Sequence, residues 1–207
     1  MKVMLLNYDN YAGLIFDMDG TLIDTMPAHL ASWQQAAEKY QFPYDKTWLH
    51  SRGGMPSKKI IAELNQMHGL NLDAEQVAQF KMQTFAEFED TGELIESTNQ
   101  VLNRFLGKKR IAVGTGSQRV SAVTLLKKNG ILKKLDAVVT ANDVENHKPN
   151  PDTFLLAAEQ IHIPPKECLV FEDTQLGMQA AHAAGMDCVL VEGDNLSFHP
   201  CQSVNEK

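Results

Sequence analysis

Two carboxylates separated by one residue follow a short apolar run near the start of the chain. Asp17 and Asp19 come directly after the run Ala12 to Phe16, and Gly20 and Thr21 complete the motif. Carboxylates this close repel each other, so the pair requires a cation beside it or a raised pKa. The motif therefore predicts a metal site or acid–base chemistry, with an Asp-rich turn as the structural alternative.

A second acidic pair, Glu172 and Asp173, follows another apolar run, Cys168 to Phe171. Two acidic strand ends in one sheet would destabilise each other without a metal ion between them. Ligands that are all oxygen atoms favour Mg²⁺, which takes one or two carboxylates, some waters and a substrate phosphate. We therefore expect Mg²⁺ as the cofactor, because the cysteines and histidines show no spacing typical of a zinc site.

Two hydroxyl side chains and a glycine, at Thr115, Gly116 and Ser117, follow a third apolar run at residues 110–114. At a strand-to-helix turn, free backbone N–H groups can hold phosphate oxygens. The segment is thus a candidate phosphate-binding loop. A simple helix N-cap by Thr115 or Ser117 fits the local sequence equally well.

Lys148 lies in a loop stiffened by Pro149 and Pro151, and a helix is predicted to begin near Pro151. A lysine held in this way can direct a fixed positive charge at a site with a smaller loss of entropy. Considered alone, such a loop is more often a surface turn. Its position after a predicted strand favours a functional role.

These segments need a scaffold, and the apolar runs predict an α/β fold with a doubly wound, Rossmann-like parallel sheet. Strands are expected at residues 12–17, 110–114, 137–141, 168–172 and 187–191, with helices at about 119–129, 152–161 and 175–184. This alternation predicts right-handed crossovers between parallel strands. The carboxyl ends of such strands share one edge of the sheet, where we expect the acidic pairs and Lys148 to meet.

Helical periodicity fills the segment between the first strand and about residue 93. Helices are expected at 28–40, from Ser57 onward, and at 73–90, where Asp73 is a plausible N-cap. We expect residues 26–93 to form a helical bundle that is inserted into a core of residues 1–25 and 94–207 and stands over its carboxyl edge. The tail at 193–207 shows no period and is predicted to be a frayed end.

Composition excludes several classes of partner. The chain has 207 residues, 43% of them hydrophobic, and a formal net charge of −7, which argues against nucleic acid or an acidic membrane surface as a partner. The basic run Lys108 to Arg110 is predicted to be a solvated connection before a strand. No apolar stretch reaches the roughly 18 residues that span a bilayer, and the N-terminus has no signal pattern. We expect a monomer in the cytosol.

The chain resembles the haloacid dehalogenase-like phosphatase superfamily, whose four motifs it matches in the same order: Asp17 with Asp19, then Thr115, then Lys148, then Glu172 with Asp173. The resemblance covers nearly the whole chain. The insertion at 26–93 resembles the helical cap of the β-phosphoglucomutase-like subgroup. The expected fold is therefore a haloacid dehalogenase-like core with an inserted α-helical cap.

The resemblance implies that Asp17 is a nucleophile that forms an aspartyl phosphate. Such an intermediate splits hydrolysis into two easier steps. Mg²⁺ would be held by the Asp17 carboxylate, the Asp19 carbonyl and Asp173, with help from Glu172. Asp19 would also protonate the leaving sugar oxygen, which requires a pKa above the roughly 3.9 of a free Asp.

Other matched residues are expected to stabilise the charge on the transferring phosphoryl group. These are Thr115, Lys148 and the Gly116 amide, acting together with Mg²⁺. Ser117, in the same loop, is a further candidate for binding phosphate.

The resemblance also points to residues of the insertion that would contact substrate. His29 and Lys81 look equivalent to a histidine and a lysine that contact substrate in the related mutases, and Gly53-Gly54-Met55 would be the specificity loop. The alternatives are a polar helix-face residue for His29 and a solvated helix lysine for Lys81. Where the mutases place an arginine for the distal phosphate, this chain has Ser57, although Arg52 could substitute for it.

We therefore predict a Mg²⁺-dependent phosphatase of small sugar phosphates, and the resemblance implies fructose 1-phosphate or 6-phosphogluconate as substrates. A phosphomutase is the main alternative, but Ser57 favours water as the final acceptor. A non-enzymatic phosphorylation switch of the receiver-domain kind is a third possibility. A dehalogenase is disfavoured, because a proton donor at Asp19 has no role when halide leaves. The expected partner is a small phosphorylated sugar.

Overall fold

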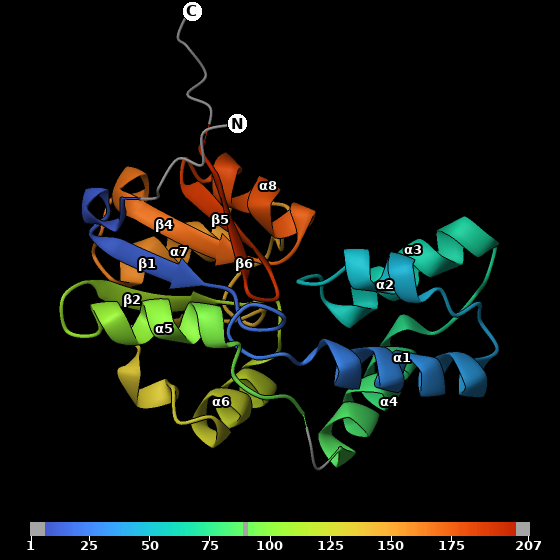
Figure 1. Ribbon diagram of the computed structural model, residues 1–207. Helices are drawn as coiled ribbons and strands as arrows, with labels where there is room; N and C mark the ends of the chain where they lie inside the picture. Colours follow the sequence, from blue (N-terminus) through green and yellow to red (C-terminus); the bar gives the residue numbers. More distant parts are fainter. Residues whose placement is uncertain (1–6, 89–90, 202–207) are drawn as a thin grey trace, which may run out of the picture.

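The computed structural model describes residues 7–88 and 91–201, and these contain a central six-stranded sheet. Its strands are β1 (Gly13–Phe16), β2 (Arg110–Gly114), β3 (Ala137–Val139), β4 (Cys168–Glu172), β5 (Asp187–Glu192) and β6 (Asn195–His199). The strand order is β3-β2-β1-β4-β5-β6, and all pairs are parallel except β5 with β6. The predicted α/β fold with a doubly wound sheet is confirmed (Figure 1).

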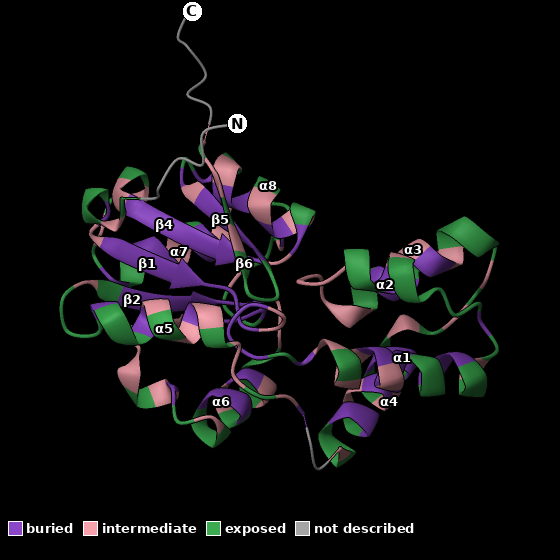
Figure 2. Ribbon diagram, viewed as in Figure 1, coloured by how far each residue is buried: buried purple, intermediate pink, exposed green. Residues whose placement is uncertain are grey.

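Strand β1 lies in the middle of the sheet because every residue in it can be buried on one face or the other. Leu14 and Phe16 pack on the face covered by α5 (Glu96–Phe105) and α6 (Arg119–Lys128). Ile15 packs on the opposite face, against α7 (Asp152–Gln160) and α8 (Gln175–Ala183). A continuous apolar run is what a strand covered on both faces requires. Figure 2 shows β1 and β4 buried and exposed residues on α5 and α6.

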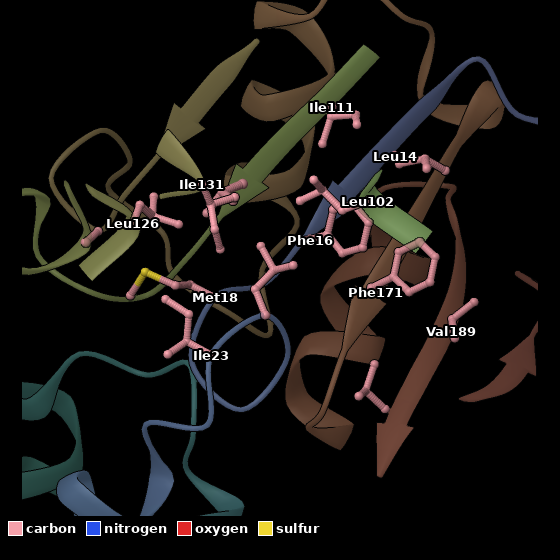
Figure 3. Packing of buried hydrophobic residues seen from close by; sticks show 14 of the residues in the cluster. Leu14, Phe16, Met18, Ile23, Leu102, Ile111, Leu126, Ile131, Phe171 and Val189 are labelled. Atoms are coloured by element: carbon pink, nitrogen blue, oxygen red, sulfur yellow. The ribbon is translucent and has the colours of Figure 1, made fainter. Parts of the chain in front are cut away.

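Aromatic packing fixes β1 against β4 next to the site. Phe16 pairs in register with Phe171, and their rings stack with centroids 4.5 Å apart (Figure 3). Both side chains are fully buried. Burial of a side chain of this size contributes about 1.5–3 kcal/mol. The residues that directly follow the two rings, Asp17 and Glu172, are thereby held at neighbouring strand ends.

Four of the five α-helices between β1 and β2 form a helical unit with a hydrophobic cluster of its own. They are α1 (Met26–Tyr40), α2 (Lys46–Ser51), α3 (Ser57–His68) and α4 (Ala74–Glu87). Leu30, Trp33, Ile61 and Val77 lie in the cluster that they share. In Figure 1 the arrowheads of β1 and β4 point toward this unit. The helical unit therefore faces the carboxyl edge of the sheet.

Helix α4 begins as the sequence predicts. The carboxylate of Asp73 accepts hydrogen bonds from the Glu75 and Gln76 amides, which confirms its role as N-cap. The helix ends at Glu87, earlier than the predicted end at Asp90, which lies outside the described residues.

The prediction of a frayed tail is wrong for residues 193–201. Strand β6 pairs with β5 across the two-residue turn Gly193-Asp194, in which Gly193 has a φ of 60°. Leu196 and Phe198 alternate with polar residues and pack on the main core. This alternation is the period-two pattern of a half-buried edge strand. The sheet is therefore mixed at this edge, not parallel throughout.

Two helices of the described chain were not predicted. Helix α2 is only six residues long, so it is too short to show a period. Helix α5 carries polar residues around most of its surface, and its buried contacts come mainly from Leu102 and Phe105. Tertiary packing, more than local pattern, stabilises such a helix. None of the helices in residues 7–88 and 91–201 is long and apolar enough to cross a membrane.

Candidate active site

A buried cation joins the ends of β1 and β4. The Lys148 Nζ donates to Asp17 Oδ1 at 2.6 Å and to Glu172 Oε1 at 2.7 Å, and a third hydrogen bond goes to the Gly114 carbonyl at 3.1 Å. Lys148 and Asp17 are only 1% and 2% exposed. Burial disfavours the charge on Lys148, but the two carboxylates outweigh that effect and raise its pKa. The surface turn considered for the Lys148 loop is therefore wrong.

Glu172 is held by the start of helix α8. Its second oxygen accepts from the amide and the hydroxyl of Thr174, at 2.7 and 2.8 Å, and Thr174 in turn caps the helix by accepting from the Gly177 amide. A Cβ on Gly177 would lie 1.9 Å from the Glu172 carboxyl carbon. Gly177 is thus required for Glu172 to fit beneath the helix.

Three carboxylates gather where a divalent cation could bind. One oxygen each of Asp17, Glu172 and Asp173 lies within 4.8 Å of the others. Burial, followed by repulsion from neighbouring carboxylates, raises the pKa of both Asp17 and Asp173, although Lys148 opposes the shift. One lysine cannot neutralise three carboxylates. The group is therefore suited to a metal ion with oxygen ligands.

Asp19 lies beside this cluster and is bound by two hydroxyl groups and a histidine. Its Oδ1 accepts from the Thr25 hydroxyl at 2.7 Å and lies 3.2 Å from His29 Nε2, and its Oδ2 accepts from the Ser117 hydroxyl at 2.6 Å. Burial would raise the Asp19 pKa, but the hydrogen bond and charge of His29, with the bonds from Ser117 and Thr25, lower it below its usual value. The raised pKa expected for a general acid at Asp19 is therefore wrong for this arrangement.

The candidate phosphate loop follows β2 as predicted. Thr115 is 1% exposed, and its hydroxyl accepts from the Ser117 amide at 3.0 Å. Helix α6 begins later, at Arg119, with Gln118 at its N-cap position and no side-chain cap. The alternative of an N-cap by Thr115 or Ser117 is therefore wrong. The loop is an independent turn at the edge of the site.

A pair of side chains from the helical unit, the buried Lys81 and the partly buried His29, extends to Asp19. The Lys81 Nζ lies 2.6 Å from His29 Nδ1, and the His29 ring stacks on Phe85 with centroids 4.2 Å apart. An ammonium group only donates, so Nδ1 accepts and the His29 Nε2–H donates to Asp19. Burial lowers the pKa of Lys81 to about 8, and burial together with the Lys81 charge lowers the pKa of His29. The polar helix face considered for His29 and the solvated lysine considered for Lys81 are both wrong.

A cleft of about 650 Å³ separates the helical unit from the core. Asp19, Gly116 and Ser117 line it from the core, and His29 and Lys81 line it from the helical unit. The volume lies within the range of small-molecule sites.

The Gly53-Gly54 loop closes one end of this cleft against the core. A Cβ on Gly116 would lie 2.0 Å from the Gly54 carbonyl oxygen, and a Cβ on Gly53 would lie 2.9 Å from Thr174. Arg52 also lines the cleft, but its Nε donates to Glu63 at 2.7 Å. The glycines therefore permit a backbone contact between the two parts of the molecule.

Some residues of the site were not predicted from the sequence. Thr25, which donates to Asp19, was not predicted, and the roles of Thr174 and Gly177 in holding Glu172 were missed. A threonine three residues before a glycine at a helix start is a cap signal that could have indicated the pair. Thr25 has no comparable local signal.

The sequence of the chain matches a known protein family over most of its length. The family model for haloacid dehalogenase-like hydrolases matches residues 14–191. Fructose-1-phosphate phosphatase YqaB of Escherichia coli (strain K12) is 39% identical over 88% of this chain and 97% of its own. The phosphorylated carbohydrates phosphatase of Thermotoga maritima is 32% identical over 84% of this chain and 82% of its own.

A solved structure agrees with the fold. The β-phosphoglucomutase of Clostridium difficile superposes with a TM-score of 0.79 at 23% identity, covering 88% of this chain and 85% of that one. This likeness concerns the fold, including the helical unit between the first two strands of the sheet.

Proposed function

The chain belongs to the haloacid dehalogenase-like hydrolases, and from this premise we propose that it is a Mg²⁺-dependent phosphatase of small sugar phosphates. One observation carries the proposal: Asp17, Glu172 and Asp173 gather at the carboxyl edge of the sheet, where Lys148 is bonded to the first two, next to a cleft of about 650 Å³. Open α/β sheets bind ligands at this edge, beside the point where strand order reverses between β1 and its neighbours.

Asp17 is the proposed nucleophile. Its carboxylate oxygen attacks phosphorus, the bond from phosphorus to the sugar oxygen breaks, and an aspartyl phosphate forms. Water then attacks the same phosphorus, which releases phosphate and restores Asp17. The buried Lys148, hydrogen-bonded to Asp17, fixes the carboxylate and offsets the charge of the transferring group.

Asp19 is the proposed acid for the leaving sugar oxygen and the base for the attacking water. Its low pKa here results from His29, Ser117 and Thr25, all of which donate to it or interact with it favourably. A sugar oxygen that displaces one of these donors would raise the pKa of Asp19 toward the range of a general acid. Substrate binding would thus allow Asp19 to carry the proton that it donates to the leaving sugar oxygen.

Mg²⁺ is the metal we propose for the acidic cluster, held by Asp17, Asp173 and the Asp19 carbonyl, with Glu172 in support. The donor set fits this ion because all its atoms are oxygens and the two raised pKa values indicate missing positive charge. When bound, the ion would supply charge stabilisation for the phosphoryl oxygens.

The helical unit at residues 26–93 is proposed to act as a lid on the core of residues 1–25 and 94–207. Asp17 is 2% exposed and the Gly54 carbonyl abuts Gly116, so substrate cannot reach the nucleophile unless this contact opens. Closure would then exclude water from the phosphoryl group. His29, Lys81, Arg52 and Gly54 would contact the sugar from the lid.

The proposed substrates are fructose 1-phosphate or 6-phosphogluconate-like compounds. The named activities of the relatives in Escherichia coli and Thermotoga maritima support this class. A phosphomutase remains the alternative, but it needs a cation for a second phosphate. Ser57 stands where that arginine is expected, and the possible substitute, Arg52, is bound to Glu63. The monomeric state and the cytosolic location stay predictions.

Replacing Asp17 by Asn tests the proposal. We expect hydrolysis of an aryl phosphate and of fructose 1-phosphate, with Mg²⁺ present, to fall at least about 1,000-fold, because the amide is not a nucleophile. Asp24→Asn, at an exposed position nearby, serves as the matched control and should keep its activity. Undiminished turnover by the Asp17 variant would reject the scheme. Conversion of a sugar 1-phosphate to an isomer, without free phosphate, would favour the mutase.

A further inference from the structure

A second pocket, of about 430 Å³, lies at the end of the sheet opposite to Asp17. Its walls come from the segment between α5 and β2 and from the residues just before β3. Five cationic side chains and one carboxylate line it: Lys108, Lys109, Arg110, Lys133, Lys134 and Asp136. The chain has 19 lysines and arginines and a net charge of −7, so this is a local reversal of the overall charge. The solvated connection predicted for residues 108–110 is thus part of a basic pocket.

Both oxygen atoms of the one carboxylate in the pocket, Asp136, accept hydrogen bonds within the protein. Asp136 Oδ1 accepts from Arg110 at 2.7 Å, and its Oδ2 accepts from the Ile111 amide at 2.8 Å. Asp136 therefore neutralises the charge of Arg110. The other four cations of the pocket form no ion pair with a carboxylate of the described chain.

Two of these four cations are held in place by neutral acceptors. Lys109 Nζ donates to the Tyr11 carbonyl, and Lys134 Nζ donates to Asn103 Oδ1 at 2.9 Å. Such bonds orient an ammonium group without cancelling its charge. The side-chain ammonium groups of Lys108 and Lys133 make no hydrogen bond or ion pair with residues 7–88 or 91–201. The pocket therefore combines fixed cations with cations that are available to a ligand.

We propose that this basic pocket binds a compact oligophosphate, either a free inorganic triphosphate or the triphosphate end of a nucleotide. Like charges gathered in one place repel, and a ligand with several negative charges would remove that repulsion. Lysine and arginine are the usual partners of phosphate oxygens. A long nucleic acid fits poorly, since the chain as a whole is acidic.

The pocket can be occupied together with the active site. Strand β1 begins beside it at Gly13 and ends beside Asp17, and four residues at about 3.3 Å each separate the two ends by about 13 Å. A ligand in the basic pocket would not block Asp17. The proposal is therefore independent of the proposed phosphatase activity.

An NMR titration of the ¹⁵N-labelled full chain with sodium triphosphate, in 150 mM NaCl and EDTA, tests the proposal. We expect saturable shifts in the amides of residues 106–111 and 133–136, one ligand per chain, and weaker binding as salt rises. Titration with ATP separates the two sources: tighter binding with added shifts at Leu106 and Leu135, the apolar parts of the wall, would identify a nucleotide. Equal affinity for triphosphate and ATP would show that the pocket recognises the phosphate groups alone.

Variants that remove positive charge show whether triphosphate binding depends on the pocket or only on the net charge of the chain. Lys108→Gln/Lys133→Gln should weaken binding at least tenfold. Lys46→Gln/Lys127→Gln removes the same charge from exposed positions elsewhere and should leave binding unchanged. Three results would overturn the proposal: no saturation, equal weakening in both double variants, or shifts confined to residues 17–19 and 114–117, the active site.

Discussion

Lys148 is buried and donates to three oxygen atoms, so at the residue scale the proposed catalytic lysine also has a structural role. Removing one partner of a buried ion pair is strongly destabilising, because the remaining charge is left unpaired. Substitutions of Lys148 would therefore confuse lost folding with lost chemistry. Asp17→Asn is the cleaner variant, since its amide oxygen can still accept from Lys148.

Lys81 gives a prediction about pH. Burial lowers its pKa to about 8, compared with 10.5 in an unfolded chain, so between these values the unfolded state binds more protons than the folded state. Stability linked to Lys81 must therefore rise as the pH increases from 8 to 10.5, by up to about 3 kcal/mol.

Urea denaturation of wild type and Lys81→Met, at several pH values between 7 and 10.5, measures this effect. The free energy of unfolding of wild type, relative to the variant, should increase across that range. Lys58→Met, which alters an exposed lysine on α3, is the control and should show no such increase. A constant difference between wild type and Lys81→Met would show that Lys81 is not held as a buried cation.

At the scale of elements, the sheet presents its reactive residues through short turns that follow strands. Asp17 follows β1, Thr115 follows β2, and Glu172 ends β4, so three parallel strands in register deliver them to one edge. The helical unit completes the site through the loop between α2 and α3. That loop lies directly against Gly116, whose added Cβ would meet the Gly54 backbone.

Gly116→Ala tests the importance of this contact. The added Cβ would lie 2.0 Å from the Gly54 carbonyl oxygen, so the loop or the lid must move away. We expect kcat/KM for a sugar phosphate to fall at least tenfold, because displacements of about 1 Å at a reacting centre can cost 100-fold.

A glycine far from the site controls for the substitution itself. Gly130→Ala, at an exposed position with no atom within 4 Å of the added Cβ, should retain kcat/KM even though its φ of 69° costs some stability. Unchanged kinetics in Gly116→Ala would mean that the closed contact plays no part in turnover.

Some strands of the sheet could be predicted from the sequence and others could not. The apolar runs before Asp17 and Glu172 predicted β1 and β4, because a buried parallel strand has to be apolar throughout. Strand β6 was missed because Leu196 and Phe198 provide only two alternating apolar positions. The environment of Asp19 was also mispredicted. Its pKa depends on His29 and Thr25, whose proximity follows from how α1 packs and not from a motif.

At the scale of the whole molecule, the proposed metal site gathers three carboxylates around one lysine, so its charges are not balanced by the residues alone. Burial raises the pKa of Asp17 to about 8, so between about pH 4 and pH 8 the folded state holds a proton that the unfolded state releases. Stability without metal should therefore fall as the pH rises through that range. Mg²⁺ must displace the same proton, so its binding should strengthen with pH.

Thermal unfolding with EDTA and with saturating Mg²⁺, at pH 6 and pH 8, measures this linkage. A ligand at 100 times its Kd adds about 2.7 kcal/mol, which for a chain of this size raises Tm by about 5–10 °C. We expect the increase to be larger at pH 8 than at pH 6. Asp173→Asn should lose most of it. A Tm that does not respond to Mg²⁺ at either pH would remove the basis for the metal site.

The proposed mechanism requires a covalent bond between phosphorus and a carboxylate oxygen of Asp17, and rapid acid quenching can detect that bond directly. Enzyme mixed with fructose 1-phosphate and Mg²⁺ is quenched within the first turnover, and its intact mass and peptides are measured. We predict a population heavier by one phosphoryl group, located on the peptide that contains Asp17, and absent in Asp17→Asn. Phosphate release with no phosphorylated enzyme at any quench time, or a phosphoryl group on another residue, would contradict the mechanism.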